Sequence, residues 1–130
     1  RIERQSQNAA KVSEFLENNE NVSKVIYPNN SDKNKKYFNK KLYGNLIGFH
    51  IDKGYEACKT FIDNLKLFYH VANIGDVRSL AIHPSSTTHS QLSKENQEKA
   101  GVFDNYIRLS IGIEHIDDII DDLDNALNSL

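Results

Sequence analysis

Arg108 is the residue of this sequence whose type and setting best suit the binding of a small molecule. It lies in the stretch NYIRLSIGIEHID, residues 105–117, whose alternation predicts a strand. One face of that strand is apolar and suits a core: Ile107, Leu109 and Ile111. The other face is polar: Tyr106, Arg108 and Ser110. A guanidinium on a rigid strand presents a planar fork that fits a carboxylate in a bidentate manner. Because most arginines are simply exposed to solvent, the residues alone favour a surface charge over a binding group.

Other residue types invite other kinds of chemistry. His70, His83 and His89 match no zinc spacing, so hydrogen-bonded loop histidines are favoured over a metal site. The lysine-rich stretch 33–41 lacks interleaved base-stacking aromatics on a strand surface, and it is expected to be a solvated loop. Cys58 falls on the apolar side of a predicted helix, which favours a small buried hydrophobe over a nucleophile.

The bulk composition is that of an ordinary globular domain. The chain has 130 residues, of which 38% are hydrophobic and 26% charged, and this length suits one domain with its own core. A net charge of −2 favours neither nucleic acid nor a membrane surface as a partner. The apolar runs are too short to span a bilayer. The single cysteine excludes an internal disulfide, so a reducing, cytoplasmic setting is expected.

Periodicity and turn residues predict an alternation of helices and strands along the chain. Helices are expected at the start of the chain to about Asn18, around Tyr37 and Phe38, over 54–65, from the cap Ser93 to Gly101, and over 116–127. Strands or short extended segments are expected at 21–28, 45–51, 67–75, 78–84 and 105–111.

The last helix carries the strongest pattern. Its buried stripe is predicted to be Ile116, Ile119, Ile120, Leu123 and Leu127. Its solvent side is predicted to hold five aspartates: Asp117, Asp118, Asp121, Asp122 and Asp124.

The order of elements, with mostly short connections, predicts an α+β fold: a small, mainly antiparallel sheet with helices packed on one face. Residues 1–130 are expected to form one domain. The chain contains no methionine and opens at Arg1 inside a helical pattern. We therefore expect it to be the C-terminal piece of a longer protein.

Two motifs resemble a known family. The segment ANIGDVRSLAIHPSSTTHSQLS and the pattern R-x-S-x-G-x-E of residues 108–114 are similar to the C-terminal domain of the Cys/Met-metabolism pyridoxal-phosphate enzymes. Weaker similarity covers essentially the whole chain. The resemblance implies the small C-terminal domain of the fold type I pyridoxal-phosphate transferases. That family includes cystathionine synthases and lyases, methionine γ-lyases and O-acetylhomoserine sulfhydrylases.

The resemblance also implies roles for individual residues. The strand arginine of the family grips the α-carboxylate of the amino-acid substrate, and here it is Arg108. Asn73 stands where lyases usually have serine, contacts the same carboxylate region in the family, and is typical of the sulfhydrylases. Thr88 is expected near the substrate side chain. Ala72 replaces the glutamate with which cystathionine enzymes meet a distal ammonium, so a small second substrate such as sulfide is favoured.

The family resemblance places the catalytic machinery elsewhere. The Schiff-base lysine and the rest of the pyridoxal 5'-phosphate site belong to the large N-terminal domain, so no catalytic or cofactor-binding residue is expected in this chain. The chain alone is expected to be inactive. The whole protein is expected to be a homotetramer that makes homocysteine from O-acetylhomoserine and sulfide in methionine biosynthesis. The alternatives are methionine γ-lyase, cystathionine γ-synthase or lyase, and, from another class, a free-standing amino-acid-sensing or oligomerisation module.

Overall fold

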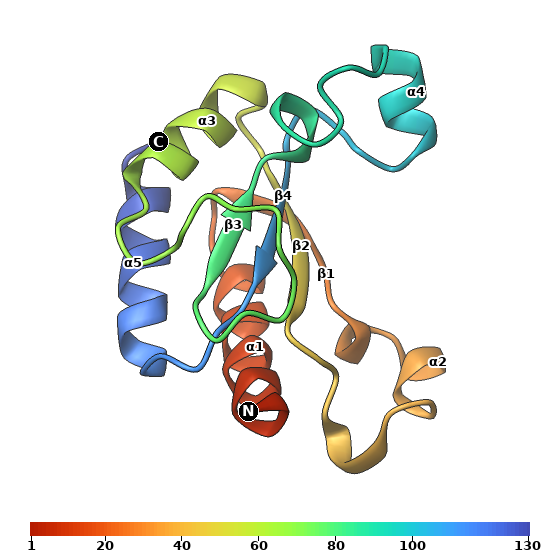
Figure 1. Ribbon diagram of the computed structural model, residues 1–130, viewed down its shortest axis with the longest axis vertical. Helices are drawn as coiled ribbons and strands as arrows, with labels where there is room; N and C mark the ends of the chain where they lie inside the picture. The colour runs from red at the N-terminus through yellow and green to blue at the C-terminus, as the bar shows by residue number, and fades with distance from the viewer.

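The computed structural model describes residues 1–130, apart from the side chain of Lys40. Helices and strands alternate along the chain (Figure 1). In chain order the elements are α1 (Ile2–Glu17), β1 (Val22–Ile26), η1 (Pro28–Asn30), α2 (Asp32–Lys35), η2 (Asn39–Lys41), β2 (Leu46–Ile51), α3 (Tyr55–Asn64), β3 (Leu80–Ile82), η3 (Pro84–Ser86), α4 (Lys94–Lys99), β4 (Tyr106–Ser110) and α5 (Ile116–Asn128), where η denotes a short 3₁₀ helix.

The four strands form one antiparallel sheet in the order β1-β2-β4-β3. Strand β4 is therefore internal, with β2 on one side and β3 on the other. Arg108 pairs with Gly48 of β2 and with Ile82 of β3. The sheet and its helices confirm the predicted α+β class.

The core lies between one face of the sheet and helices α1, α3 and α5. Alternate side chains of β2 and β4 are fully buried there: Ile47, Phe49, Ile51, Ile107, Leu109 and Ile111. The ring of Phe49 meets that of Phe61 on α3 edge to face, with 5.6 Å between centroids. Helices α3 and α5 lie side by side (Figure 1). The predicted burial of Ile107, Leu109, Ile111 and Cys58 is confirmed.

The segment between α3 and β3 crosses the other face of the sheet. We call residues 65–79 the α3–β3 connection, drawn in green in Figure 1. An isolated bridge pairs Tyr69 with Leu80, and beyond it the chain forms a loop. The prediction of an extended segment over 67–75 is therefore wrong, except at Tyr69. Backbone donors of this connection bond to side chains of other elements, as described below, and so do not need a strand partner.

Two further predictions are corrected. Tyr37 and Phe38 lie between α2 and η2, not in a helix, and the short helix instead begins at Asp32. Asp122 is 8% exposed and does not face solvent. Its carboxylate accepts hydrogen bonds from the backbone N–H groups of Lys66 and Leu67, both at 2.9 Å, and of Phe68 at 3.3 Å. Three donors can compensate for the loss of hydration, which explains how a charged group lies inside the structure.

The helix that follows Ser93 agrees with its predicted ends. The hydroxyl of Ser93 accepts from the N–H of Asn96, and Gly101 follows the helix with a φ of +77°, a conformation that favours glycine. Among the residues described, no helix has both the length and the apolar character that a bilayer span requires.

Candidate functional site

Arg108 lies in the middle of β4 on the face opposite the core. Its neighbour Gly48 has no side chain, and the phenol of Tyr106 occupies the space above that glycine, where an added Cβ would collide with the ring. Ile82, the neighbour on the other side, is buried. Burial raises the pKa of the Tyr106 hydroxyl, and the nearby positive charge of Arg108 opposes that shift. Arg108 is thus half-buried, next to a glycine that the ring of Tyr106 covers and to the buried Ile82.

The guanidinium of Arg108 has an unused donor. Its Nη2 donates to the carbonyl oxygen of Ala72 at 2.9 Å. Its Nε is buried and meets no hydrogen-bond partner among the described residues, and no described residue forms an ion pair with this side chain. The bond of Nη2 lies at the exposed end of this side chain, so an anion that brings its own oxygens can reach that end and compensate the charge.

The structure brings one of the other two predicted site residues close to Arg108. Asn73 is exposed and follows Ala72, the residue that Arg108 contacts. Thr88 lies on the segment after η3, with its Oγ1 2.8 Å from His89 Nδ1. Within the described part of the chain, no hydrogen bond joins Thr88 to Arg108 or Asn73. The geometry shows that the strand contacts the loop at Ala72, whereas the roles of Asn73 and Thr88 rest on the resemblance.

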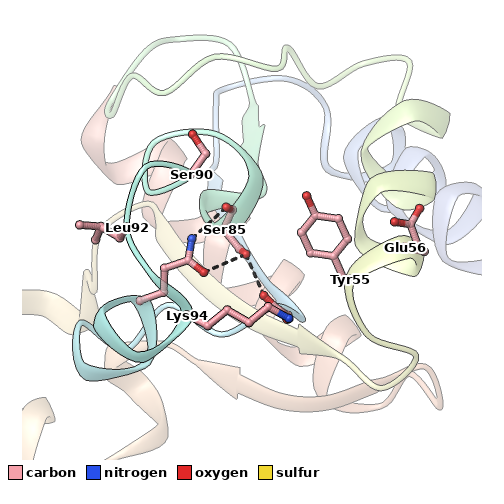
Figure 2. A pocket seen from close by; sticks show the side chains of 8 residues that line it. Tyr55, Glu56, Ser85, Ser90, Leu92 and Lys94 are labelled. Atoms are coloured by element: carbon pink, nitrogen blue, oxygen red, sulfur yellow. Dashed lines mark hydrogen bonds and ion pairs between the residues drawn. The ribbon is translucent and has the colours of Figure 1, made fainter.

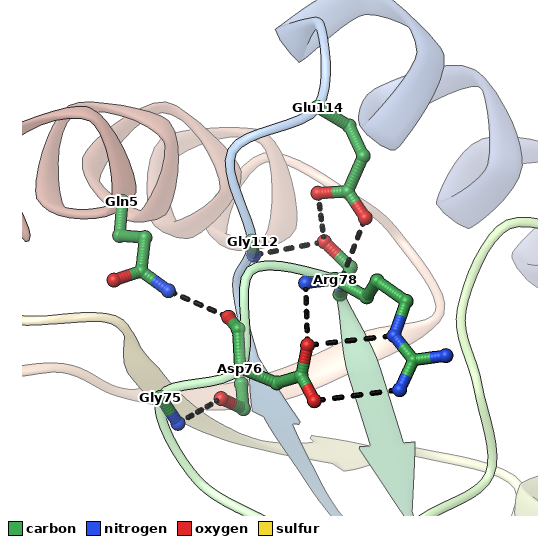
Figure 3. A network of polar contacts seen from close by, with 8 residues as sticks. Gln5, Gly75, Asp76, Arg78, Gly112 and Glu114 are labelled. Atoms are coloured by element: carbon green, nitrogen blue, oxygen red, sulfur yellow. Dashed lines mark hydrogen bonds and ion pairs between the residues drawn. The ribbon is translucent and has the colours of Figure 1, made fainter. Parts of the chain in front are cut away.

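A polar network holds the loop that carries Asn73 (Figure 3). Gly75 N–H donates to Ser110 Oγ at 3.0 Å, and Gln5 Nε2 donates to the carbonyl oxygen of Asp76 at 2.7 Å. Ser79 donates to Glu114 twice, from its N–H at 2.6 Å and from its hydroxyl at 2.9 Å. Elements far apart in sequence thus fix the end of the α3–β3 connection.

Asp76 is also part of this network. It accepts from the backbone N–H of Arg78 at 3.0 Å, and its carboxylate faces the Arg78 guanidinium at 3.4 Å. These contacts, the backbone one first, lower the pKa of the Asp76 carboxyl. Arg78 also lies over the ring of Tyr69, 4.5 Å from its centroid. The guanidinium of Arg78 thus contacts two other residues of the α3–β3 connection, Asp76 and Tyr69.

Several residues of this site were not found from the sequence. Gln5, and Asn8, whose Nδ2 donates to the carbonyl oxygens of Gly112 and Glu114, are buried polar residues of α1. Their only signal was a polar residue on the side of the helix that carries Ala9 and Val12. Gly48 gave a clearer signal, as a glycine inside a predicted strand often marks a close approach of another group.

His83 and Cys58 are structural. His83 Nε2 lies 2.7 Å from the carbonyl oxygen of Asp104, which can only accept, so Nε2 carries the proton and Nδ1 faces Ser86 Oγ at 2.8 Å. Burial raises the pKa of the Cys58 thiol to about 12, so it is not a thiolate near neutral pH. The described residues include no cluster of three or more His, Cys, Asp or Glu side chains that could hold a metal ion.

The buried imidazole of His83 predicts a pH dependence of stability. Desolvation lowers its pKa from 6.5, the contact with Asp104 opposes the shift, and His70 and Lys59 add to it. The unfolded chain therefore binds a proton more readily. The stabilising contribution is complete above the ordinary pKa and is lost as pH falls from 6.5 through the lowered value.

We expect the free energy of unfolding to fall on acidification in this window, with a slope of at most about 1.4 kcal/mol per pH unit from this one group. Urea denaturation at a series of pH values measures the slope. A His83→Gln variant should lack the contribution of His83 to this slope. An identical slope in the variant would contradict the role of His83.

A pocket of about 450 Å³ lies away from Arg108, between α3 and α4 (Figure 2). Tyr55 and Glu56 stand on one side of it, and Ser85, Ser90 and Lys94 on the other. Polar groups that line it are paired with one another. Ser85 Oγ donates to Asp104 at 3.0 Å, Gln97 Nε2 donates to the carbonyl oxygen of Ser85 at 3.1 Å, and Lys94 pairs with Asp104 at 3.1 Å. These bonds connect α4 to η3.

The lysines bear on whether this chain could hold pyridoxal phosphate alone. A lysine that forms a Schiff base needs an enclosed setting that shifts its pKa. Every lysine whose side chain the structure describes is exposed. These residues do not fit the cofactor by themselves.

The chain is similar to proteins of a known family. A family model described as Cys/Met metabolism PLP-dependent enzyme matches residues 1–128. An O-acetyl-L-homoserine sulfhydrylase from Leptospira meyeri is 50% identical over the whole of this chain, and an L-methionine gamma-lyase from Fusobacterium nucleatum subsp. polymorphum is 40% identical. The chain spans 30% and 34% of their lengths, respectively.

A solved structure shares the fold in detail. It is a Campylobacter jejuni protein named as an O-acetylhomoserine (thiol)-lyase, and it contains N'-pyridoxyl-lysine-5'-monophosphate. The similarity has a TM-score of 0.92 at 46% identity, and covers 98% of this chain and 31% of that one.

Proposed function

Because this chain belongs to the Cys/Met metabolism PLP-dependent enzymes, we propose that it is the C-terminal, substrate-carboxylate-binding domain of an O-acetylhomoserine sulfhydrylase. The observation that carries the proposal is the guanidinium of Arg108, which has no anionic partner among the described residues. An α-amino acid supplies such a partner through its carboxylate.

The arrangement around Arg108 supports a carboxylate in particular. The guanidinium is held by the carbonyl of Ala72 through an exposed hydrogen bond, so its terminal nitrogens are the groups that a planar anion can reach. The side-chain amide of Asn73, on the neighbouring residue, can donate to the same anion. We propose Thr88, exposed on the segment after η3, as a contact for the substrate side chain. By fixing the carboxylate, Arg108 would align the rest of the substrate for reaction.

We propose the following reaction for the whole protein: the bond between the γ-carbon and the ester oxygen of O-acetylhomoserine breaks, sulfide takes its place, and homocysteine and acetate leave. Pyridoxal phosphate would act as the electron sink, bound by a part of the protein outside this chain. The exposed lysines described above are consistent with that division. The chain alone is then expected to show no activity.

Asn73 favours a sulfhydrylase, because serine is usual at this place in the lyases. Ala72 disfavours the cystathionine enzymes alone, because it offers no carboxylate to a second ammonium group. The relatives named as sulfhydrylases include the 50% identical protein, against 40% for the methionine gamma-lyase.

We also propose that the whole protein is a cytoplasmic homotetramer. Other parts of it would cover the face of this domain that carries the α3–β3 connection. Apolar side chains of the α3–β3 connection are exposed: Tyr69, Val71, Ile74 and Val77. Exposed apolar groups gathered on one segment are typical of a surface that meets another surface.

The test is an assay of the full-length protein with two substrates. With O-acetylhomoserine and sulfide, we expect homocysteine and acetate. With methionine, we expect little release of methanethiol and 2-oxobutyrate. Efficient cleavage of methionine without sulfhydrylation would assign the protein to the lyases and overturn the proposal.

A further inference from the structure

The two hydrogen-bond donors of the proposed site lie on different kinds of structure, a strand and a loop. Arg108 is on an internal strand, whereas Asn73 is exposed on a loop without regular secondary structure. Two donors bind one carboxylate well only if their separation is held to within about 0.5 Å. Some part of the structure must therefore fix the loop relative to the strand.

Every second residue from Arg108 to Glu114 contacts this loop. Arg108 donates to the carbonyl of Ala72, and Ser110 accepts from the N–H of Gly75. Gly112 N–H donates to Ser79 Oγ at 2.9 Å, and Glu114 accepts both donors of Ser79. Later residues of this stretch contact later residues of the loop, from Ala72 to Ser79.

The groups that bond the loop are themselves fixed by other contacts. Ser110 is 2% exposed, and its Oγ also accepts from Asn45 Nδ2 at 3.0 Å, so the hydroxyl oxygen has a fixed place. At residue 112, an added Cβ would collide with the carboxylate of Glu114 and the carbonyl of Val77. Glycine therefore allows the loop to approach the strand end closely.

We propose that Ser110 and Glu114 are positioning residues that set the separation between the Asn73 amide and the Arg108 guanidinium. They touch no substrate; they hold the main chain of the loop that carries Asn73. The inference rests on the proposed function, because it assumes that these two donors share a carboxylate.

The test uses the full-length enzyme and two inhibitors that differ only in the carboxylate. L-norleucine has no leaving group, and pentylamine is the same molecule without its carboxylate. Glu114→Ala and Ser110→Ala should each weaken inhibition by L-norleucine about tenfold and leave inhibition by pentylamine unchanged. Glu114→Gln should recover most of the loss, because its amide can still bond to Ser79.

Asp122→Ala is the matched control. Its carboxylate also holds backbone N–H groups of the α3–β3 connection, but at residues 66–68, beyond the bridge of Tyr69 to Leu80. We expect that variant to lose stability and to keep the ratio of the two inhibition constants. An equal loss of L-norleucine inhibition in Asp122→Ala would mean general loosening and would overturn the inference.

Arg108→Ala separates this inference from the function on which it rests. Suppose that Arg108→Ala weakens inhibition by L-norleucine but not by pentylamine, while Ser110→Ala and Glu114→Ala leave both unchanged. The proposed site then stands and the positioning role is wrong. If Arg108→Ala has no selective effect, the carboxylate site itself is wrong. Should Glu114→Ala not fold, Ser110→Ala decides, and an unchanged ratio there overturns the inference.

Discussion

Replacing Arg108 with alanine in the full-length enzyme is expected to lower kcat/KM for the amino-acid substrate by about 10²- to 10³-fold. Truncation of one partner in a buried, hydrogen-bonded charge pair costs about 2–5 kcal/mol, and each 1.4 kcal/mol is tenfold. KM should rise, because the fork binds the carboxylate before reaction, and kcat should fall as the substrate loses alignment.

Steady-state kinetics and the absorbance of the bound cofactor measure the effect. The spectrum should stay unchanged, since Arg108 is proposed to hold the substrate and not the cofactor. Arg108→Lys keeps the charge without the planar fork and should give an intermediate loss. Arg4→Ala, which removes an exposed arginine of α1, should have no effect. An unchanged kcat/KM in Arg108→Ala would remove the basis of the proposed site.

Replacing Asp122 with alanine is expected to cost roughly 3–5 kcal/mol of the free energy of unfolding. The substitution leaves three backbone N–H groups without an acceptor, those of Lys66, Leu67 and Phe68. Phe68 belongs to the core, so water reaches this place poorly. Urea denaturation followed by circular dichroism measures the loss.

The neighbouring aspartate supplies the control for this second prediction. Asp121 is on the same helix and is exposed, so Asp121→Ala should change the free energy of unfolding by no more than about 0.5 kcal/mol. Equal losses in the two variants would show that the effect arises from helix α5 itself and not from the bonds of Asp122.

The sequence alone predicted the elements in which apolar residues recur at regular spacing. Strict alternation from Tyr106 to Ile111 predicted both the core face of β4 and the opposite face with Arg108. The stripe of α5 predicted the burial of Ile116, Ile119, Leu123 and Leu127, whereas Ile120 is only partly buried. These patterns succeed because burial of one face is a local property of a strand or helix. The proposal that Arg108 binds a carboxylate came from residue type, strand position and family pattern together.

The residues that hold the loop could not be found in this way. Asp122 looks like its four exposed or half-exposed neighbours in composition, and only its partners more than 50 residues away make it a buried group. The same is true of Gln5, whose acceptor is 71 residues away. Periodicity records which face is apolar, but it carries no information about which distant backbone group a polar side chain will meet.

Over residues 70–78, the hydrogen bonds that join the α3–β3 connection to other described elements all use its main chain. They involve the N–H of 75 and the carbonyls of 72, 76 and 77, the last of which accepts from the N–H of Ile113. Side chains such as those of Ala72 and Asn73 contribute nothing to this anchorage. If these residues meet the substrate as proposed, substitutions there would alter substrate choice without loosening the loop, and a lineage could acquire new specificities on an unchanged scaffold.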